Sequence, residues 1–115
     1  MIRAKRVYEP WEAADGYRLL IDRLWPRGIS REQARIDRWM REVAPSTNLR
    51  KWFSHDPEKW PEFQQRFRQE LSEHPEVLQE IRELAELHGT LTLVFSSRET
   101  RYNNAQALLL MLAEG

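Results

Sequence analysis

The sequence predicts a compact α/β domain in which a small, largely parallel sheet is flanked by helices. Strand-like apolar runs at residues 17–23 and 90–96 alternate with amphipathic helical segments, as in proteins with a parallel sheet. The length of 115 residues suits a single domain over 1–115. Hydrophobic residues make up 41% of the chain and aromatic residues 10%, which is too high a content for a disordered protein.

The first two expected elements are strands. Residues 2–8 predict a strand whose charged side chains suit an exposed or edge position. The turn dipeptide Asp15-Gly16 then precedes a strand over 17–23. The contiguous apolar run Leu19–Ile21 indicates that both faces of this strand are covered.

The segment that follows is ambiguous. Ser30 with Gln33 forms a capping-box pattern, which indicates the start of a helix. Apolar residues at helical spacing predict a helix over 31–43, and a strand over 36–43 is the alternative. Pro45 ends the segment in either case, because proline cannot continue a helix or a paired strand.

The second half predicts three helices, a strand and a last helix. Residues 75–88 place Val77, Ile81 and Leu87 on an expected inner face. The expected elements are a short helix from Ser46 to Phe53, a helix after Asp56-Pro57 with an apolar stripe to Leu71, a helix over 75–88 closed by Gly89, a strand over 90–96, and a helix over roughly 102–113.

Charge is balanced over the whole chain but not within each half. Residues 1–55 carry 12 Lys/Arg and 7 Asp/Glu, whereas residues 56–115 carry 6 and 11. This distribution indicates either a basic face suited to anions, which guanidinium groups bind in a bidentate manner, or a compositional bias with a solvated acidic helix pair. The formal net charge of zero disfavours a dedicated nucleic-acid-binding protein.

Several classes of protein are excluded or disfavoured by what the sequence lacks. The absence of cysteine excludes disulfides, thiolate metal sites and a cysteine nucleophile. No apolar run approaches the roughly 20 residues of a membrane helix, and no signal-peptide pattern follows the N-terminus. The three histidines lack metal-binding spacing, and no glycine-rich phosphate loop is present. We therefore expect a cytoplasmic protein of bacterial type without membrane, metal or cofactor.

Polar residues follow both strong strands, where ligands bind in open α/β sheets. Residues 22–28 supply two arginines on a loop shaped by proline and glycine, and residues 96–104 supply hydroxyl groups and a helix start that favours anions. If the two strands are neighbours, these groups converge on one cleft for phosphate, carboxylate or a nucleotide. The expected ligand-binding residues are Arg23, Trp25, Arg27, Ser96, Ser97 and Asn103.

A purely structural interpretation of the same residues is also open. Arg23 could pair with Asp22 or Glu99, and Arg27 could be a solvated loop residue. Trp25 could fill part of the core, which is the commoner fate of a single loop tryptophan. In that case the hydroxyl groups and the asparagine would only cap the last helix.

His55 is the candidate catalytic residue. It follows a basic and aromatic stretch at 49–53 and stands beside Asp56, and its ordinary pKa near 6.5 suits a general acid or base. The alternative is a loop histidine that is hydrogen-bonded to the start of the next helix.

A set of motifs spans nearly the whole chain: Asp15–Arg18, Asp22–Gly28, Ala44–Ser46, Leu49–Phe53, His55–Pro57, Asn103 and Ala105. Together they resemble the YeaO-like family of uncharacterised bacterial proteins, catalogued as domain of unknown function 488. This resemblance implies a small α/β domain, with no established activity to carry across. The family pattern often has a histidine where this chain has Tyr102; if that histidine were catalytic, this chain would have lost it or replaced it with a phenol.

Three functions follow, in order of preference. The first is a small enzyme or binding domain for an anionic small molecule. The second is a nucleic-acid-binding module that uses the basic first half and its tryptophans. The third is a protein-interaction domain with the aromatic loops 9–12 and 24–29 as its surface. The sequence leaves the oligomeric state, the ligand and the reaction open.

Overall fold

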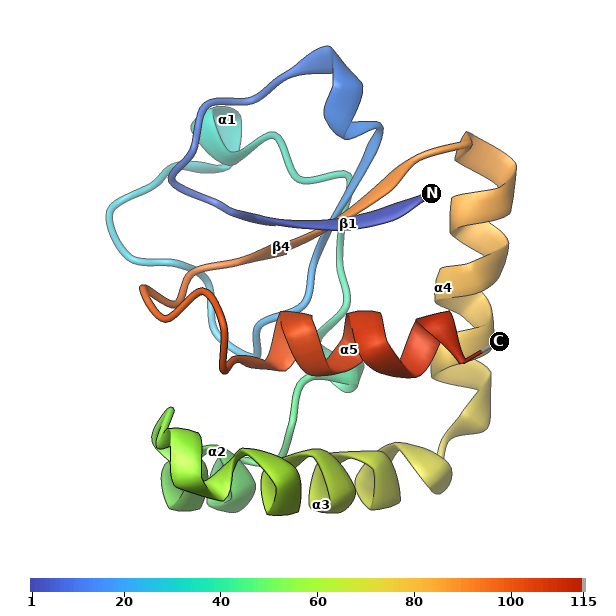
Figure 1. The fold of residues 1–115 in the computed structure, drawn as a ribbon. Coiled ribbons are helices and arrows are strands. Elements are labelled where there is room, and N and C mark those ends of the chain that lie inside the picture. Colours follow the sequence, from blue (N-terminus) through green and yellow to red (C-terminus); the bar gives the residue numbers. More distant parts are fainter. Residues whose placement is uncertain (115) are drawn as a thin grey trace.

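The chain folds into a four-stranded parallel sheet with helices on both faces, shown by the computed structural model in Figure 1, which describes residues 1–114. The predicted α/β class and largely parallel sheet are confirmed. The strand order is β1-β4-β2-β3. The strands are β1 (Ile2–Arg6), β2 (Tyr17–Leu20), β3 (Arg38–Trp39) and β4 (Leu91–Phe95).

Strand β4 lies between β1 and β2 and is buried along its whole length. Leu91 is in register with Ile2 on one side and with Tyr17 on the other. The two strong strands of the sequence are therefore neighbours, and β1 lies at an edge, as its charges suggested. Because all the strands are parallel, the carboxyl ends of β2 and β4 lie at the same end of the sheet.

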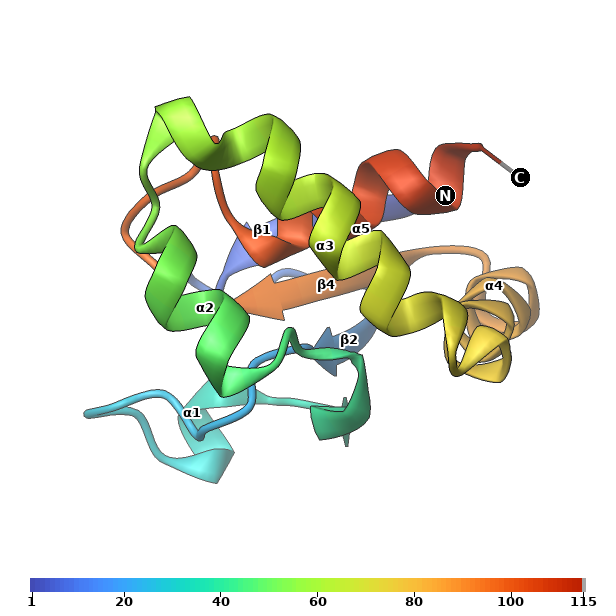
Figure 2. The same ribbon diagram turned by 90° about the horizontal axis from the view of Figure 1, so that it is seen from below.

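The larger core lies between one face of the sheet and four helices. Figures 1 and 2 show α1 on the opposite face of the sheet from α5. Within residues 1–114, no helix combines the length and the apolar character needed to cross a membrane. The helices are α1 (Arg31–Ala34), α2 (Thr47–Phe53), α3 (Trp60–Ser72), α4 (Pro75–His88) and α5 (Asn104–Ala113).

The expected helix over 31–43 is wrong beyond residue 34. The capping box of Ser30 and Gln33 is present, but Arg35 adopts a left-handed conformation with φ of 48° and ends α1 after four residues. The chain then adds β3 to the edge of the sheet, where the Met40 amide donates to the carbonyl of Leu20 at 2.8 Å. Pairing with β2 therefore overrides the helical spacing, and the alternative strand is confirmed over Arg38–Trp39.

Helix α4 has the expected bounds, but one of its expected inner residues was wrong. Val77 and Ile81 are buried, whereas Leu87 is 76% exposed. At about 100° per residue, position 87 lies about 120° around the helix from Ile81 and about 160° from the buried Ala85, so its side chain is on the outer face of α4.

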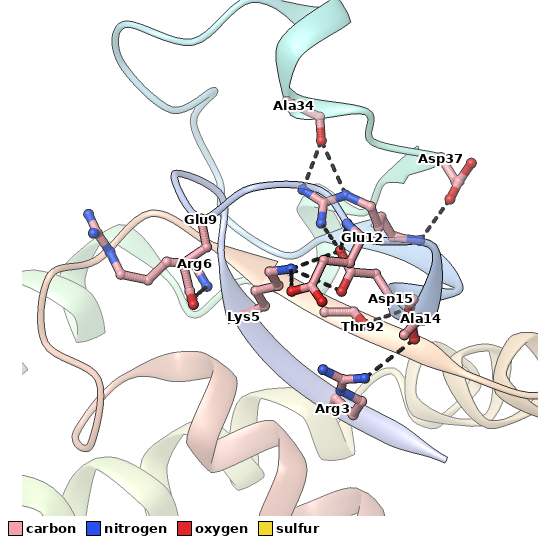
Figure 3. A network of polar contacts seen from close by, with 11 residues as sticks. Arg3, Lys5, Arg6, Glu9, Glu12, Ala14, Asp15, Ala34, Asp37 and Thr92 are labelled. Atoms are coloured by element: carbon pink, nitrogen blue, oxygen red, sulfur yellow. Dashed lines mark hydrogen bonds and ion pairs between the residues drawn. The ribbon is translucent and has the colours of Figure 1, made fainter.

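The face of the sheet that carries α1 contains a buried ion cluster formed by Lys5, Glu12, Asp15 and Arg18 (Figure 3). Asp15 is fully buried; its Oδ1 lies 3.1 Å from Lys5 Nζ and its Oδ2 accepts from Arg18 Nη1 at 2.6 Å. The remaining Arg18 donors bind the carbonyl of Ala34 at 2.9 and 3.2 Å. Only Glu12 of the four reaches solvent.

Opposing effects set the pKa values in this cluster. Burial by itself raises the pKa of the Asp15 carboxyl, but the Glu12 amide, Lys5 and Arg18 outweigh it and hold that pKa below its ordinary value. Burial by itself lowers the pKa of Lys5, but the contacts with Asp15 and Glu12 outweigh this effect and raise the pKa above its ordinary value. The shifts of both groups favour their charged forms, an ionised Asp15 carboxylate and a protonated Lys5 ammonium.

Gly16 joins this cluster to β2 and has no room for a side chain. Its φ is 65°, and a Cβ at this position would lie 2.2 Å from the carbonyl oxygen of Thr90. The Tyr17 amide also donates to that oxygen at 2.9 Å, so the backbone of Thr90 cannot move away freely. A glycine is required here because the loop must pass directly over the start of β4.

Candidate functional site

A cleft of about 400 Å³ lies beyond the carboxyl ends of β2 and β4. Figure 1 shows the loop before α1 and the loop after β4 at the same end of the sheet. The cleft brings together residues 22–27, the segment from Ala44 to α2, His55, and the residues after β4. We call it the arginine cleft, after Arg23, Arg27 and Arg50 in its lining.

Hydrogen bonds to backbone carbonyls fix the loop that carries Arg23 and Arg27. Trp25 Nε1 donates to the carbonyl of Ile29 at 2.8 Å, and Tyr8 Oη donates to the carbonyl of Arg27 at 2.7 Å. Gly28, with φ of 76°, allows the chain to turn between them. Trp25 also packs against the smaller core cluster, so it is both a core residue and a lining residue of the cleft.

The three arginines come from different segments. Arg23 Nη2 donates to the carbonyls of Ala44 and Pro45 at 3.4 and 3.1 Å. Within residues 1–114, the other N–H groups of this guanidinium form no hydrogen bond to the backbone. Arg27 and Arg50 are exposed. Among residues 1–114, none of these three guanidinium groups forms an ion pair with a carboxylate, so the pairing of Arg23 with Asp22 or Glu99 is not found.

Asp22 lines the cleft directly after β2 and connects it to the segment after β4. Its Oδ2 accepts from the Ser96 amide at 2.9 Å and from Ser96 Oγ at 2.7 Å, and Asn104 Nδ2 lies 3.5 Å from Oδ1. Burial raises the pKa of the Asp22 carboxyl, and the contacts with Ser96 and Asn104 and the field of Arg50 offset this only in part.

His55 and Ser97 meet at the rim of the cleft, 42 residues apart in the chain. His55 Nδ1 lies 2.9 Å from the carbonyl of Tyr102, which can only accept, so Nδ1 carries the proton. His55 Nε2 lies 3.4 Å from Ser97 Oγ. Ser97 Oγ accepts from the Glu99 amide at 3.0 Å and can donate to the Glu99 carbonyl, which lies 3.3 Å away.

The backbone around His55 is strained. Ser54 and His55 both adopt left-handed conformations, with φ of 46° and 55°, although neither is glycine. Each such residue costs of the order of 1 kcal/mol, and the pair places the exposed imidazole at the rim of the cleft, within reach of Ser97. In chemical terms the result is an oriented hydrogen-bonding group next to a serine hydroxyl.

Most of the expected site residues lie at this cleft. Arg23, Trp25, Arg27, Ser96, Ser97 and His55 line it. Asn103 does not; it is fully buried, its Oδ1 accepts from the Gln106 amide at 2.9 Å and its Nδ2 donates to the carbonyl of Glu99 at 2.6 Å. Its side chain is thus occupied in capping α5, and Asn104 lines the cleft in its place.

Sequence reasoning missed Asp22 and Arg50 as lining residues. Asp22 is the first polar residue after the apolar run of β2, and that position was a usable signal. Arg50 stands in the basic stretch 49–53, but no sequence pattern indicates that the packing of α2 brings its side chain to the cleft. Within residues 1–114, no group of three or more histidine or acidic side chains is arranged to hold a metal ion.

Comparisons with known proteins place the chain among uncharacterised bacterial relatives. The model of a family described as "Inactive DUF488-N3 subclade" matches residues 1–115. The chain is 40% identical over 107 residues to the uncharacterized protein YeaO of Escherichia coli K12, covering 93% of this chain and 92% of YeaO. It is 38% identical over 111 residues to the uncharacterized protein Rv3073c of Mycobacterium tuberculosis H37Rv, covering 96% of this chain and 92% of the relative. No solved structure matches it.

Proposed function

This chain belongs to the YeaO-like DUF488 family, and we propose that it binds a small anionic molecule, a phosphate, nucleotide or carboxylate, in the arginine cleft. The supporting observation is that Arg23, Arg27 and Arg50 line one cleft and, in the part of the chain that the structure describes, pair with no carboxylate. Guanidinium groups match phosphate and carboxylate oxygens in bidentate geometry. Three cations against the single carboxylate of Asp22 leave an excess of positive charge.

The size and walls of the cleft suit a small molecule. Its volume of about 400 Å³ falls within the range of pockets that hold small ligands. Trp25 and Tyr8 supply aromatic walls, and Ser96 and Ser97 supply hydroxyl groups beside the arginines. The backbone contacts of Arg23 position its guanidinium before a ligand arrives, which lowers the entropy cost of binding.

A binding role is preferred to a catalytic one. His55 Nε2 could accept the proton of Ser97, so the geometry allows general-base chemistry, with His55 as the base. The matched subclade is described as inactive, and this favours His55 and Ser97 as residues that contact the ligand and hold the rim in place.

A nucleic-acid-binding role is less well supported. Tryptophans that would stack on bases already have guanidinium groups over their rings: Arg35 lies 4.4 Å from the Trp11 centroid and Arg41 lies 3.7 Å from that of Trp39. A base would have to displace these cations from the ring faces they cover, at the cost of an existing cation–π contact.

The test is calorimetric titration with inorganic phosphate, AMP and citrate. We expect at least one to bind the wild type, and Arg50→Ala to weaken that binding by about tenfold or more, because a charge-assisted hydrogen bond is lost. Lys51→Ala is the matched control, since Lys51 is the next residue of α2, exposed, and not in the cleft lining. Failure of all three ligands to bind, or equal losses in both variants, would contradict the proposal.

A further inference from the structure

The carboxylate of Asp22 is an unexpected group in a cleft that binds anions. It lines the same cleft as three arginines, and its negative charge repels any anion that enters. It forms no ion pair with an arginine among residues 1–114; its direct partners are the neutral groups of Ser96 and Asn104. A site that selected for negative charge alone would be stronger without it.

One oxygen of this carboxylate has unused acceptor capacity. Oδ2 already accepts two hydrogen bonds from Ser96, at 2.9 and 2.7 Å. Oδ1 has a single long contact, 3.5 Å from Asn104 Nδ2. A carboxylate can accept about four hydrogen bonds, so Oδ1 can take a donor from a ligand.

Building on the binding function proposed above, we propose that the ligand is a phosphate ester that also carries hydroxyl groups, a sugar phosphate or nucleoside phosphate. Its phosphate binds the arginines, and a sugar hydroxyl donates to Asp22 Oδ1. A bare phosphate would leave most of the roughly 400 Å³ cleft empty. A ligand whose donor is an ammonium group is disfavoured, because Arg23, Arg27 and Arg50 outnumber the one carboxylate.

The experiment compares two phosphate monoesters of equal charge, ribose 5-phosphate and ethyl phosphate, by calorimetric titration. For the wild type we expect ribose 5-phosphate to bind about tenfold or more tightly, since a hydrogen bond to a charged group contributes that much. In Asp22→Asn the preference falls towards unity, while ethyl phosphate binds as well as before or better. Glu32→Gln, which removes an exposed carboxylate on α1 away from the cleft, keeps the wild-type preference.

The outcomes separate the two proposals. If ethyl phosphate binds the wild type but ribose 5-phosphate binds no better, the hydroxyl subsite is wrong and the anion site stands. If neither ester binds while inorganic phosphate, AMP or citrate does, the phosphate-ester ligand is wrong and the anion site stands. If none of the five ligands binds, the binding function itself is overturned. An unchanged preference in Asp22→Asn, or tighter binding of glutamate than of ribose 5-phosphate, would also overturn the subsite. The wild-type comparison needs no variant to fold.

Discussion

Two regions of the molecule combine arginine with aspartate, but only one of them pairs the opposite charges directly. In the buried ion cluster, Asp15 contacts Arg18 at 2.6 Å and Lys5 at 3.1 Å, and all three are hidden from solvent. In the arginine cleft, Asp22 contacts neutral donors, and the arginines point to no carboxylate within residues 1–114. In the first arrangement the charges neutralise one another within the fold, whereas in the second the guanidinium groups form no ion pair within residues 1–114.

The pKa directions of the two aspartates express the same difference. Burial acts on both, but the contacts of Asp15 overcome it and lower that pKa, whereas those of Asp22 do not and its pKa is raised. The ionised form of Asp15 therefore stabilises the fold, and the ionised form of Asp22 costs stability. We expect substitutions in the two regions to separate stability from binding.

The largest effect is expected for Asp15→Asn. It leaves Lys5 and Arg18 buried without their shared anion, and removing one partner of a buried ion pair typically costs about 3–5 kcal/mol. The measurement is the free energy of unfolding in urea. Glu12→Gln is the control, because the Glu12 side chain is 66% exposed and an exposed ion pair contributes at most about 1 kcal/mol. Equal losses in the two variants would refute the contrast.

The second effect is a dependence on pH. Because the pKa of Asp15 is lowered in the folded state, its contribution is complete above the unfolded-state pKa of about 4 and is lost as the pH falls through the folded-state pKa. We expect the difference in unfolding free energy between wild type and Asp15→Asn to hold from about pH 7 to 5 and shrink below about pH 4. A difference that persists undiminished at about pH 2 would contradict this.

A third effect concerns binding alone. Arg27→Ala removes an exposed guanidinium from the cleft, so we expect an anionic ligand to bind about tenfold more weakly. The unfolding free energy should change by less than about 0.5 kcal/mol, as for most surface substitutions. Arg98→Ala is the control, since Arg98 is exposed in the loop after β4 and does not line the cleft. A large loss of stability in Arg27→Ala would place it with the ion cluster instead.

The smallest effect has the opposite sign to the first. In Asp22→Asn the amide oxygen can still accept from Ser96, while the cost of a partly buried charge disappears. We expect the free energy of unfolding at neutral pH to stay within about 1 kcal/mol of wild type, on the side of greater stability. A destabilisation comparable to that of Asp15→Asn would show that the two carboxylates play the same role.

The fold was largely predictable because its strong elements have strong local patterns. The run Leu19–Ile21 and the strand at 90–96 identified the centre of the sheet, and proline and glycine marked the ends of α4. The failure at 36–43 had a specific cause. Apolar residues at helical spacing served two separate clusters there, with Met40 in the larger core and Trp39 in the smaller one.

The part of the candidate site that directly follows the strands could be predicted, because the end of a strand fixes where the next residues lie. Arg23, Arg27 and Ser96 follow the ends of neighbouring parallel strands, so their arrival at one cleft followed from the strand assignment. The contact of His55 with Ser97 depends on left-handed backbone at two non-glycine residues, which no local pattern indicates. The buried ion cluster was likewise missed, because charged residues in a strand normally indicate exposure.

The pairing of β1 with β4 has a consequence for how the protein is made. Within residues 1–114, β1 is synthesised before the other strands, but its partner β4 is synthesised after them, with Ile2 opposite Leu91. Strand β2 also needs β4 as a partner, because Tyr17 pairs with Leu91. The sheet therefore cannot close until Leu91–Phe95 has been synthesised, so these long-range strand pairs form late and favour slow folding.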